Sequence, residues 1–332
     1  LLDISRVMRK NFDPQAMNHI DQGLELAEAL HSYKKKALLY QEKFYVYQVA
    51  QKTEQGIDAA KSMLELCEKI GDKELSISAM KNIGAAYEVD LDNKSYWYEK
   101  ALKEGEQINN IKEIIWLHGA LGAVKDMQML FDESTTHCLK AIDLAQELQD
   151  EELLGFSYYN LGAVTKDERS IEYFKKTVEL FEITNSVYYW QSCVHLGWVY
   201  KEYGYFDRAL KLGYETLTRS GQRPDVIMKY CGLIVVPKPG FTYNKSQVVG
   251  DGVWVKFIDD CGDEFFGIVG EEEDRVWGKS LDQNNGFVAN AVALKIGDTF
   301  YFENNIGVKT QWKITEIKPR WLRAFHFYLD NL

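Results

Sequence analysis

The acidic run from Glu271 to Asp274 is the group of residues whose types and spacing come closest to a chemical site. It directly follows the stretch Ile268 to Gly270, in the sequence GIVGEEEDR. Carboxylate oxygens bind Mg²⁺ and Ca²⁺, so a divalent-metal site is one interpretation of this run. The strands predicted around it supply no convincing set of further carboxylates, which a metal-dependent nuclease needs. We therefore interpret the run as a solvated turn.

The histidines and cysteines show no spacing typical of a metal or redox site. No two of the six histidines lie at metal-binding helical spacing. Cys193 and His195 are two residues apart, so on a helix they point to different faces. We interpret His118, His137 and His195 as packing residues. The five cysteines are predicted to be reduced core thiols of a cytoplasmic protein: Cys67, Cys138, Cys193, Cys231 and Cys261.

Other catalytic motifs are absent from the sequence. It contains no phosphate-binding glycine loop, no GxSxG and no HExxH, which are motifs of nucleotide binding, serine hydrolysis and zinc-dependent hydrolysis. We therefore predict a protein that is not an enzyme and that has no catalytic residue, metal site or cofactor.

Charge and hydropathy limit the classes of partner. The chain has a formal charge of -11 and a pI near 5.2, which opposes general attraction to nucleic acid or anionic lipid. We interpret the basic cluster Lys34 to Lys36 as a solvated helix face. No apolar run approaches the roughly 18 residues of a membrane-spanning helix, so we expect no membrane partner. The chain starts LLDISRV, without Met, and we expect it to be a fragment.

An internal repeat organises the first two thirds of the chain. The stretches MKNIGAAYE, HGALGAVKD, YYNLGAVTK and VHLGWVYKE align on Gly84, Gly122, Gly162 and Gly197, at spacings of 38, 40 and 35 residues. Glycine inside a helix costs roughly 1 kcal/mol relative to alanine. Its recurrence therefore predicts that the second helix of each hairpin crosses the first closely at this position. The period predicts an α-solenoid of helical hairpins.

The last of these hairpins, WQSCVHLGWVYKEYGYFDRALKLGYETL, resembles the tetratricopeptide repeat. Trp190, Leu196, Gly197 and Tyr200 match the first helix of that family, and Ala209 follows the glycine by twelve residues. We assign residues 1–221 to repeats of this kind, which implies a solenoid.

Several hairpins depart from this pattern. The same interval of twelve residues joins Gly122 to Ser134, but the hairpin of Gly84 is two residues shorter and that of Gly162 about four. An earlier pair over residues 32–70 has the right length but no glycine in its first helix, which leaves its register open. Residues 14–30 look like the second helix of a still earlier pair.

The resemblance also implies a ligand site. In tetratricopeptide repeats, first-helix residues line a concave groove that binds a peptide or protein, and the glycine register carries these positions over to this chain. The resulting set mixes aromatic and charged side chains, which suits such a ligand. Each aromatic residue can instead belong to the core between repeats, and this alternative stays open. The predicted groove residues are Lys81, Glu88, Trp116, Tyr159, Lys166, Trp198 and Lys201.

A change in composition near residue 221 marks the end of the repeats. We assign residues 222–250 to a capping segment and linker, with a short helix over Pro224 to Cys231. Beyond it, the runs GVWVKFID, EFFGIVG, DTFYFEN and TQWKITEIK predict strands of a small antiparallel sheet. Phe287, Ala291 and Leu294 fall at helical spacing, which predicts one helix packed across that sheet.

The ordered strands from Gly252 to Lys318 resemble the C-terminal domain of the Gre transcript-cleavage factors. The resemblance implies an FKBP-like α+β domain over residues 251–332, with a C-terminal extension, that docks on RNA polymerase. It also implies that the acidic residues assisting Gre chemistry lie on a separate coiled coil, which this chain lacks. The resemblance is carried by strand Val253 to Ile258, by Asp260, Gly262 and Ser280, and by the docking-motif residues Gly270, Glu271, Gly297 and Asp298.

The combination of a tetratricopeptide array with a Gre-like domain resembles proteins of predicted bacterial conflict systems. In those systems a PIN ribonuclease is the effector. We predict a non-enzymatic adaptor or sensor of an anti-phage or stress response. Its groove would bind a protein or peptide, and its Gre-like domain would dock on a machine such as RNA polymerase. The alternative is the regulatory portion of a PIN-type ribonuclease whose catalytic domain lies outside this chain. A peptide-responsive regulator is a third hypothesis, which leaves the C-terminal domain unexplained.

Overall fold

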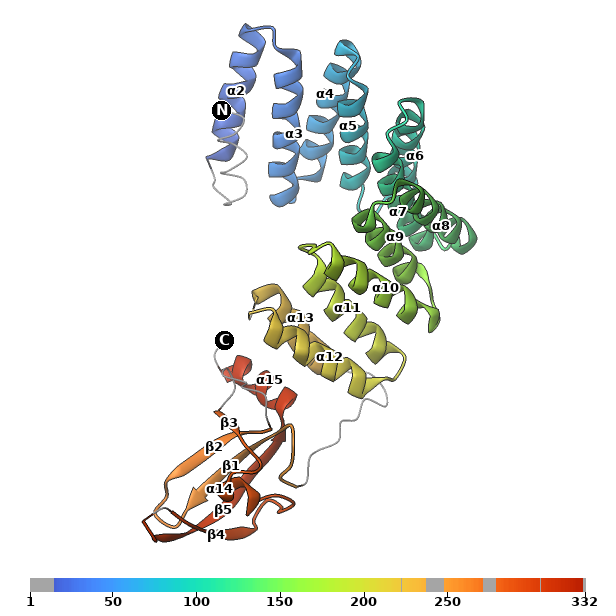
Figure 1. The fold of residues 1–332 in the computed structure, drawn as a ribbon. Helices are drawn as coiled ribbons and strands as arrows, with labels where there is room; N and C mark the ends of the chain where they lie inside the picture. The colour runs from blue at the N-terminus through green and yellow to red at the C-terminus, as the bar shows by residue number, and fades with distance from the viewer. Residues whose placement is uncertain (1–14, 222, 237–247, 271–278, 305, 331–332) are drawn as a thin grey trace. The chain divides into compact units, whose positions relative to one another are not determined.

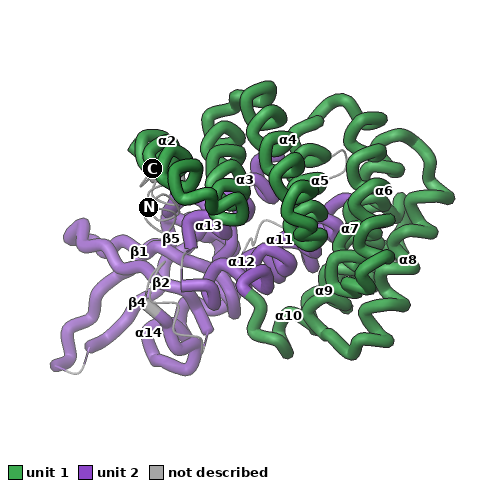
Figure 2. Tube along the Cα trace, turned by 90° about the horizontal axis from the view of Figure 1, so that it is seen from above, with its two compact units in different colours: residues 1–186 green, residues 187–332 purple. Residues whose placement is uncertain are grey.

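The computed structural model describes residues 15–221, 223–236, 248–270, 279–304 and 306–330. Helical hairpins make up most of the chain, and a small sheet follows them (Figure 1). The chain divides into two compact units, Leu1–Ser186 and Val187–Leu332, which Figure 2 colours separately. Within the described residues, none of the helices has both the length and the apolar character needed to cross a membrane.

Unit 1 consists of consecutive antiparallel helices. First helices of neighbouring hairpins pack against each other, as α3 does against α5 and α7 against α9. Figure 2 shows α6 and α8 along the outer side of unit 1, with α5, α7 and α9 inside them. The first helices therefore form the inner face of this unit. Its helices are α2 (Ala16–Ala29), α3 (Tyr33–Val49), α4 (Thr53–Ile70), α5 (Lys73–Ala86), α6 (Leu91–Gln107), α7 (Ile111–Met127), α8 (Phe131–Leu148), α9 (Glu151–Val164) and α10 (Arg169–Ile183).

Short polar side chains cap the first helices and connect the repeats. Asp72 Oδ1 accepts a hydrogen bond from Leu75 N at 3.2 Å, and Asp150 Oδ1 accepts one from Leu153 N at 3.0 Å. Such side chains satisfy backbone donors that the helix leaves unpaired. Asp72 also binds Lys34 at 2.9 Å, and Asp150 binds Lys112 at 3.1 Å. One aspartate thus begins a helix and binds the preceding repeat.

The predicted close crossing at the repeated glycines is confirmed in unit 1. A Cβ atom on Gly84 would lie 2.6 Å from the Tyr98 ring, and one on Gly162 would lie 2.9 Å from the Phe174 ring. At Gly122 the nearest atom, Cys138 Sγ, would be 2.5 Å away. Real Cβ atoms do not approach other heavy atoms this closely, so glycine is required for these helices to pack as they do.

Gly197 differs from the other repeated glycines. A Cβ atom there would find Ala209 O at 3.6 Å as its nearest neighbour, an ordinary contact. The cause lies in the second helix of this repeat. Gly213 occupies there the position that Tyr98, Cys138 and Phe174 occupy in the other repeats. The sequence prediction of a close crossing is therefore wrong at Gly197, although this repeat resembles the family most.

Unit 2 begins with α11 (Tyr189–Glu202), α12 (Phe206–Arg219) and α13 (Pro224–Val235). Pro224 occupies the first turn of α13, where its missing N–H costs nothing. The helix packs against both α11 and α12. Leu233 of α13 fills the space beside Gly213, because a Cβ atom on that glycine would lie 2.9 Å from Leu233 Cδ2. Residues 237–247 of the predicted linker lie outside the described residues.

The sheet is mixed, with strand order β3-β2-β1-β5-β4. Its strands are β1 (Val253–Asp259), β2 (Glu264–Val269), β3 (Lys279–Leu281), β4 (Thr299–Glu303) and β5 (Lys309–Pro319). The four predicted strands are present and pair antiparallel. The prediction of an entirely antiparallel sheet is wrong, because β3 pairs parallel with β2. The strand β3 has only three residues, which is too short a run for sequence periodicity to reveal a strand.

Both faces of the sheet are covered, which explains why Val253, Trp254 and Val255 are all buried. Val253, Val255 and Phe257 belong to one core, while Trp254 and Ile268 belong to another. The first core centres on Phe287, whose ring lies 5.2 Å from those of Phe257 and Phe300 and 5.1 Å from that of Trp312. Phe287 belongs to α14 (Gly286–Ala289), which is only one turn long, so the predicted helix through Leu294 is wrong in length.

The second core joins the sheet to the last helical repeats. It includes Trp254 from β1, Tyr214 from α12, Tyr230 from α13 and Phe325 from α15 (Arg320–Asp330). Tyr230 Oη donates a hydrogen bond to the Trp321 carbonyl at 2.5 Å. The predicted C-terminal extension is therefore a helix that packs on both the sheet and the repeats. This packing places α11–α13 and the sheet in one compact unit, whereas the sequence placed a domain boundary near residue 221.

Candidate functional site

Lys81, Glu113 and Trp116 form a cluster on the first helices α5 and α7. Lys81 Nζ lies 2.6 Å from Glu113 Oε2 and 4.0 Å from the centroid of the Trp116 ring. The Trp116 ring also meets the Tyr98 ring edge to face, with 5.8 Å between centroids. Trp116 remains 44% exposed. A large aromatic surface is therefore held in place by its neighbours and stays open to a ligand.

Two other predicted groove aromatics contribute mainly to packing. Tyr159 meets the Phe174 ring edge to face at 5.3 Å, and burial raises the pKa of its hydroxyl. Trp198 packs beside Gly232 of α13, where a Cβ atom would lie 3.1 Å from the indole. Both side chains are half-buried. For these two residues the core interpretation accounts for part of their surface.

Three of the charged groove residues, Glu88, Lys166 and Lys201, share one register position, four residues after the repeated glycine. Lys166 follows Gly162 by four residues, and its Nζ lies 2.8 Å from Oδ2 of Asp126, which follows Gly122 by four. Lys201 holds the same position after Gly197, but it is only 3% exposed. Its ammonium group donates to the carbonyls of Leu233 and Val236 at the end of α13. Burial also lowers the pKa of Lys201.

Glu88 occupies this register position after Gly84 and borders a cavity of about 250 Å³ in unit 1. The cavity lies between the end of α3, the start of α4 and the end of α5. Buried Phe44 and Ala86 supply an apolar floor, and polar exposed side chains form the rim. Its lining consists of Phe44, Gln48, Gln51, Lys52, Thr53, Gly56, Ala86 and Glu88.

Most of this lining was missed from the sequence because the first hairpin lacks a glycine in its first helix. There the small residue is Gly56 of the second helix α4, and a Cβ atom on it would lie 3.6 Å from the Phe44 ring of α3, an ordinary contact. Phe44 and Gly56 are twelve residues apart, the interval that separates Gly122 from Ser134. A search for a small residue on either helix would have found this register. It makes Gln48 the counterpart of Glu88.

The docking-motif residues shape turns of the sheet. Gly270 has a φ of 142°, and its N–H donates to the Leu281 carbonyl at 3.1 Å. Gly297 has a φ of 94°, which favours glycine. Asp298 Oδ2 accepts a hydrogen bond from Lys295 N at 2.8 Å in the same turn. Glu271 and the rest of the acidic run through Asp274 lie outside the described residues, so their interpretation as a solvated turn stays a prediction.

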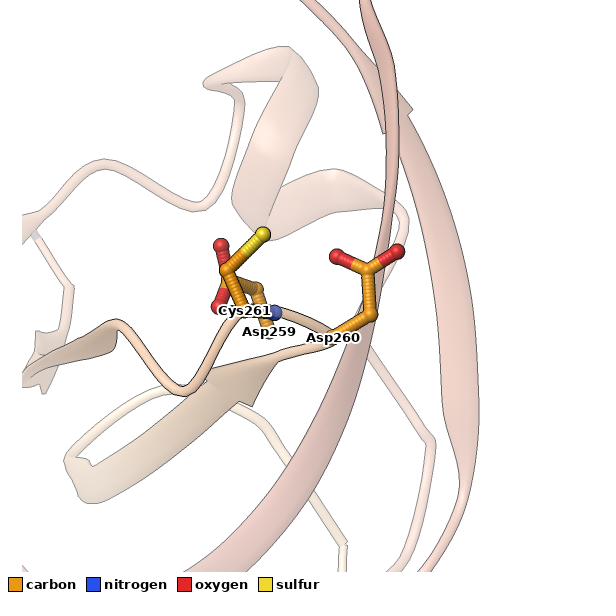
Figure 3. A group of neighbouring side chains, drawn as sticks. All are labelled: Asp259, Asp260 and Cys261. Atoms are coloured by element: carbon orange, nitrogen blue, oxygen red, sulfur yellow. Dashed lines mark hydrogen bonds between the residues drawn. The ribbon is translucent and has the colours of Figure 1, made fainter.

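One group of possible metal ligands occurs in the described part of the chain, at the turn after β1 (Figure 3). Ligand atoms of Asp259, Asp260 and Cys261 lie within 4.8 Å of one another. Asp259 Oδ1 already accepts hydrogen bonds from the N–H groups of Cys261 and Asp263, at 3.0 and 2.7 Å. The neighbouring carboxylates of Asp259 and Asp260 raise the pKa of the exposed Cys261 thiol. This geometry accounts for a hairpin turn.

The histidines interpreted as packing residues include a close pair between α7 and α8. Nδ1 of His118 lies 2.8 Å from Nδ1 of His137. Burial lowers the pKa of His118 to about 4 and also lowers the pKa of His137. His195 is likewise half-buried, with a lowered pKa, beside Lys229. One ring of the pair donates and the other accepts, so the accepting ring is neutral in this arrangement.

Solved structures share the repeat fold at low sequence identity. A Rap protein complexed with competence and sporulation factor is 15% identical with a TM-score of 0.54, over 64% of this chain and 61% of the Rap chain. NprR in complex with its cognate peptide NprX is 15% identical with a TM-score of 0.51, over 71% of this chain and 70% of NprR. A signal-transduction ATPase from Pyrococcus horikoshii with a tetratricopeptide repeat sensor is 15% identical with a TM-score of 0.54, over 68% of this chain and 37% of its own.

No protein-family model matches the chain, and no curated protein matches it in sequence. The chain spans 61% of the length of the Rap chain it matches. Similarity at 15% identity shows the fold alone. By fold, this chain is a tetratricopeptide-like array of helical hairpins, followed by a small mixed sheet.

Proposed function

We propose that this protein is a non-enzymatic interaction protein whose first helices bind a peptide or an extended protein segment on the inner face of unit 1. The observation that carries the proposal is Trp116, which is 44% exposed and held between Lys81 and Tyr98. Aromatic anchors held rigidly beside charged groups are typical of residues that dominate binding energy. The cavity beside Glu88 lies in the same unit, between the ends of the first helices α3 and α5 and the start of α4.

The structural relatives support a ligand of this class. A Rap protein was solved with competence and sporulation factor, and NprR was solved with its cognate peptide. Both share the hairpin fold with TM-scores above 0.5. Because a fold does not fix function, the residues of the inner face carry the assignment to this chain.

Selection from a random-peptide display library on the whole chain tests the proposal. Peptides that bind the wild-type chain should bind the Trp116→Ala variant at least about tenfold more weakly. The matched control is Tyr96→Ala, which removes a 57% exposed aromatic residue from the second helix α6. If both variants lose peptide affinity equally, or if neither variant loses affinity, the result would argue against a site on the inner face.

The finer hypotheses for the sheet stay proposals. A Gre-like, FKBP-like docking role for the turns at Gly270 and Gly297 predicts that the whole chain binds purified bacterial RNA polymerase. Absence of binding by biolayer interferometry would remove this hypothesis and the anti-phage or stress-response role built on it.

The regulatory role beside a PIN ribonuclease predicts that this chain changes the cleavage rate of such an enzyme encoded next to it. An unchanged rate would count against that alternative.

A further inference from the structure

The carboxylate of Glu88 lacks the cation that its counterpart in the next repeat has. That counterpart, Asp126, receives Lys166 from the following repeat at 2.8 Å. The residues that flank Glu88 at the same register position are Gln48 and Asp126, and neither is a cation. In the described part of the chain, Glu88 has no ion-pair partner. One of the equivalent inter-repeat positions is therefore left without its positive charge.

The cavity beside Glu88 has the size and lining for a long side chain. Its volume of about 250 Å³ is below the roughly 300 Å³ at which pockets for drug-sized ligands begin. The ring of Phe44 and the methyl group of Ala86 offer an apolar floor for an aliphatic stem. Gln48 and Gln51 at the rim each carry a side-chain carbonyl that accepts hydrogen bonds from a cation.

The charge of the surrounding unit favours a cationic ligand. Residues 1–186 contain 22 Lys and Arg against 32 Asp and Glu, which gives this unit a charge of -10 out of -11 for the chain. Such a field raises the local concentration of cations and their association rate. Lys52 also borders the cavity, and it opposes a cation locally. It has no ion-pair partner among the described residues, so its flexible side chain can move aside.

We propose that this cavity is a subsite for one arginine or lysine side chain of the bound peptide or protein segment. The cationic group pairs with Glu88, as Lys166 pairs with Asp126 inside the protein. The stem lies on Phe44 and Ala86, and the rim amides of Gln48 and Gln51 accept the remaining donors. This subsite rests on the proposed function, because it names one residue of the ligand that the inner face binds.

The test uses short probes on the whole chain. The probes are N-acetylated, C-amidated tripeptides with arginine, citrulline or glutamate between two alanines, and binding is followed by NMR titration. Citrulline keeps the shape of arginine without its charge. The arginine peptide should bind at least about tenfold more tightly than the citrulline peptide, and the glutamate peptide should not bind. An Ala-Ala-Ala amide with a free amino terminus should bind no better than the citrulline peptide.

Three charge variants separate a local pair from general attraction. Glu88→Gln should lower the affinity for the arginine peptide about tenfold, and Lys52→Gln should raise it. Glu106→Gln removes an exposed carboxylate from the second helix α6 and should leave the affinity unchanged. If Glu106→Gln weakens binding as much as Glu88→Gln, general attraction explains the preference and the subsite is wrong.

The remaining outcomes are equally decisive. No preference for arginine over citrulline, or tighter binding of the free-amine peptide, would overturn the assignment to a cationic side chain. In either case, library peptides that still depend on Trp116 would leave the proposed function standing. Library peptides that ignore Trp116, together with arginine binding that depends on Glu88, would keep the subsite but remove the anchor. The two failures are therefore distinguishable.

Discussion

Gly122 of α7 faces Cys138 of α8 so closely that a Cβ atom on the glycine would lie 2.5 Å from the sulfur. Ser134 Oγ donates a hydrogen bond to the Gly122 carbonyl at 2.8 Å across the same crossing. We predict that Gly122→Ala destabilises unit 1 by about 1 to 3 kcal/mol, because the added methyl overpacks the crossing by more than improved helix propensity returns. Urea denaturation followed by circular dichroism measures this change.

The matched substitution Gly197→Ala should have the opposite sign. Its added methyl finds its nearest atom at 3.6 Å, because Gly213 occupies the facing position. The gain in helix propensity, about 1 kcal/mol, should therefore appear as stabilisation. Equal destabilisation by Gly122→Ala and Gly197→Ala would show that the crossing distances do not control packing in this array.

The buried histidine pair predicts a dependence of stability on pH. In the folded state the pKa of His118 is about 4, below the usual 6.5, and the pKa of His137 is also lowered. Between pH 6.5 and about 4, His118 is therefore more often protonated in the unfolded state than in the folded state. The free energy of unfolding falls as pH falls through this range, because protons bind the unfolded state more tightly. We expect His118 alone to contribute a loss of about 2 kcal/mol between pH values of about 7.5 and 5.

A double variant tests this assignment against other titrating groups. In His118→Gln/His137→Gln, the loss of stability over the same pH range should be smaller than in the wild type. The residual dependence should come from carboxylates and from His195, whose pKa is also lowered by burial. The His31→Gln variant, at the turn after α2, serves as a control and should retain the wild-type dependence. An identical pH dependence in the double variant would contradict the prediction.

The packing of α15 predicts that the sheet and the last repeats unfold together. Phe325 is 9% exposed in the core that also contains Tyr214, Tyr230 and Trp254. Phe325→Ala should destabilise unit 2 by about 3 kcal/mol. Hydrogen exchange read by mass spectrometry should then accelerate in α12, α13 and β1 alike. Tyr301→Ala, at a 55% exposed position on β4, is the control. Faster exchange confined to the sheet would argue against a shared core.

Sequence periodicity predicted the hairpins, and short aromatic and β-branched runs between turns predicted four of the strands. It could not reveal β3, whose three residues make too short a pattern, or the parallel pairing of β3 with β2. Continuous burial in β1 arises because Trp254 faces α15 while Val253 and Val255 face the aromatic core. That arrangement depends on contacts with Phe325, more than seventy residues away in sequence, which no local pattern encodes.

The candidate site shows the same division between local and tertiary information. The glycine register placed both Trp116 and Glu88 on first helices. The structure has both side chains exposed, but Glu88 lies two residues beyond the end of α5. The register could not show that Lys166 is bound to Asp126, or that Lys201 is buried against the end of α13. Both arrangements result from packing between repeats. Glu88 is a predicted groove charge that has no ion-pair partner among the described residues.

The most direct measurement is the affinity of one library-selected peptide for the wild-type chain, the Trp116→Ala variant and the Tyr96→Ala control, by isothermal titration calorimetry. A site on the inner face predicts at least about tenfold weaker binding to Trp116→Ala and unchanged binding to Tyr96→Ala. Unchanged binding to Trp116→Ala, or weaker binding to the Tyr96→Ala control, would contradict the claim that the first helices of unit 1 hold the ligand.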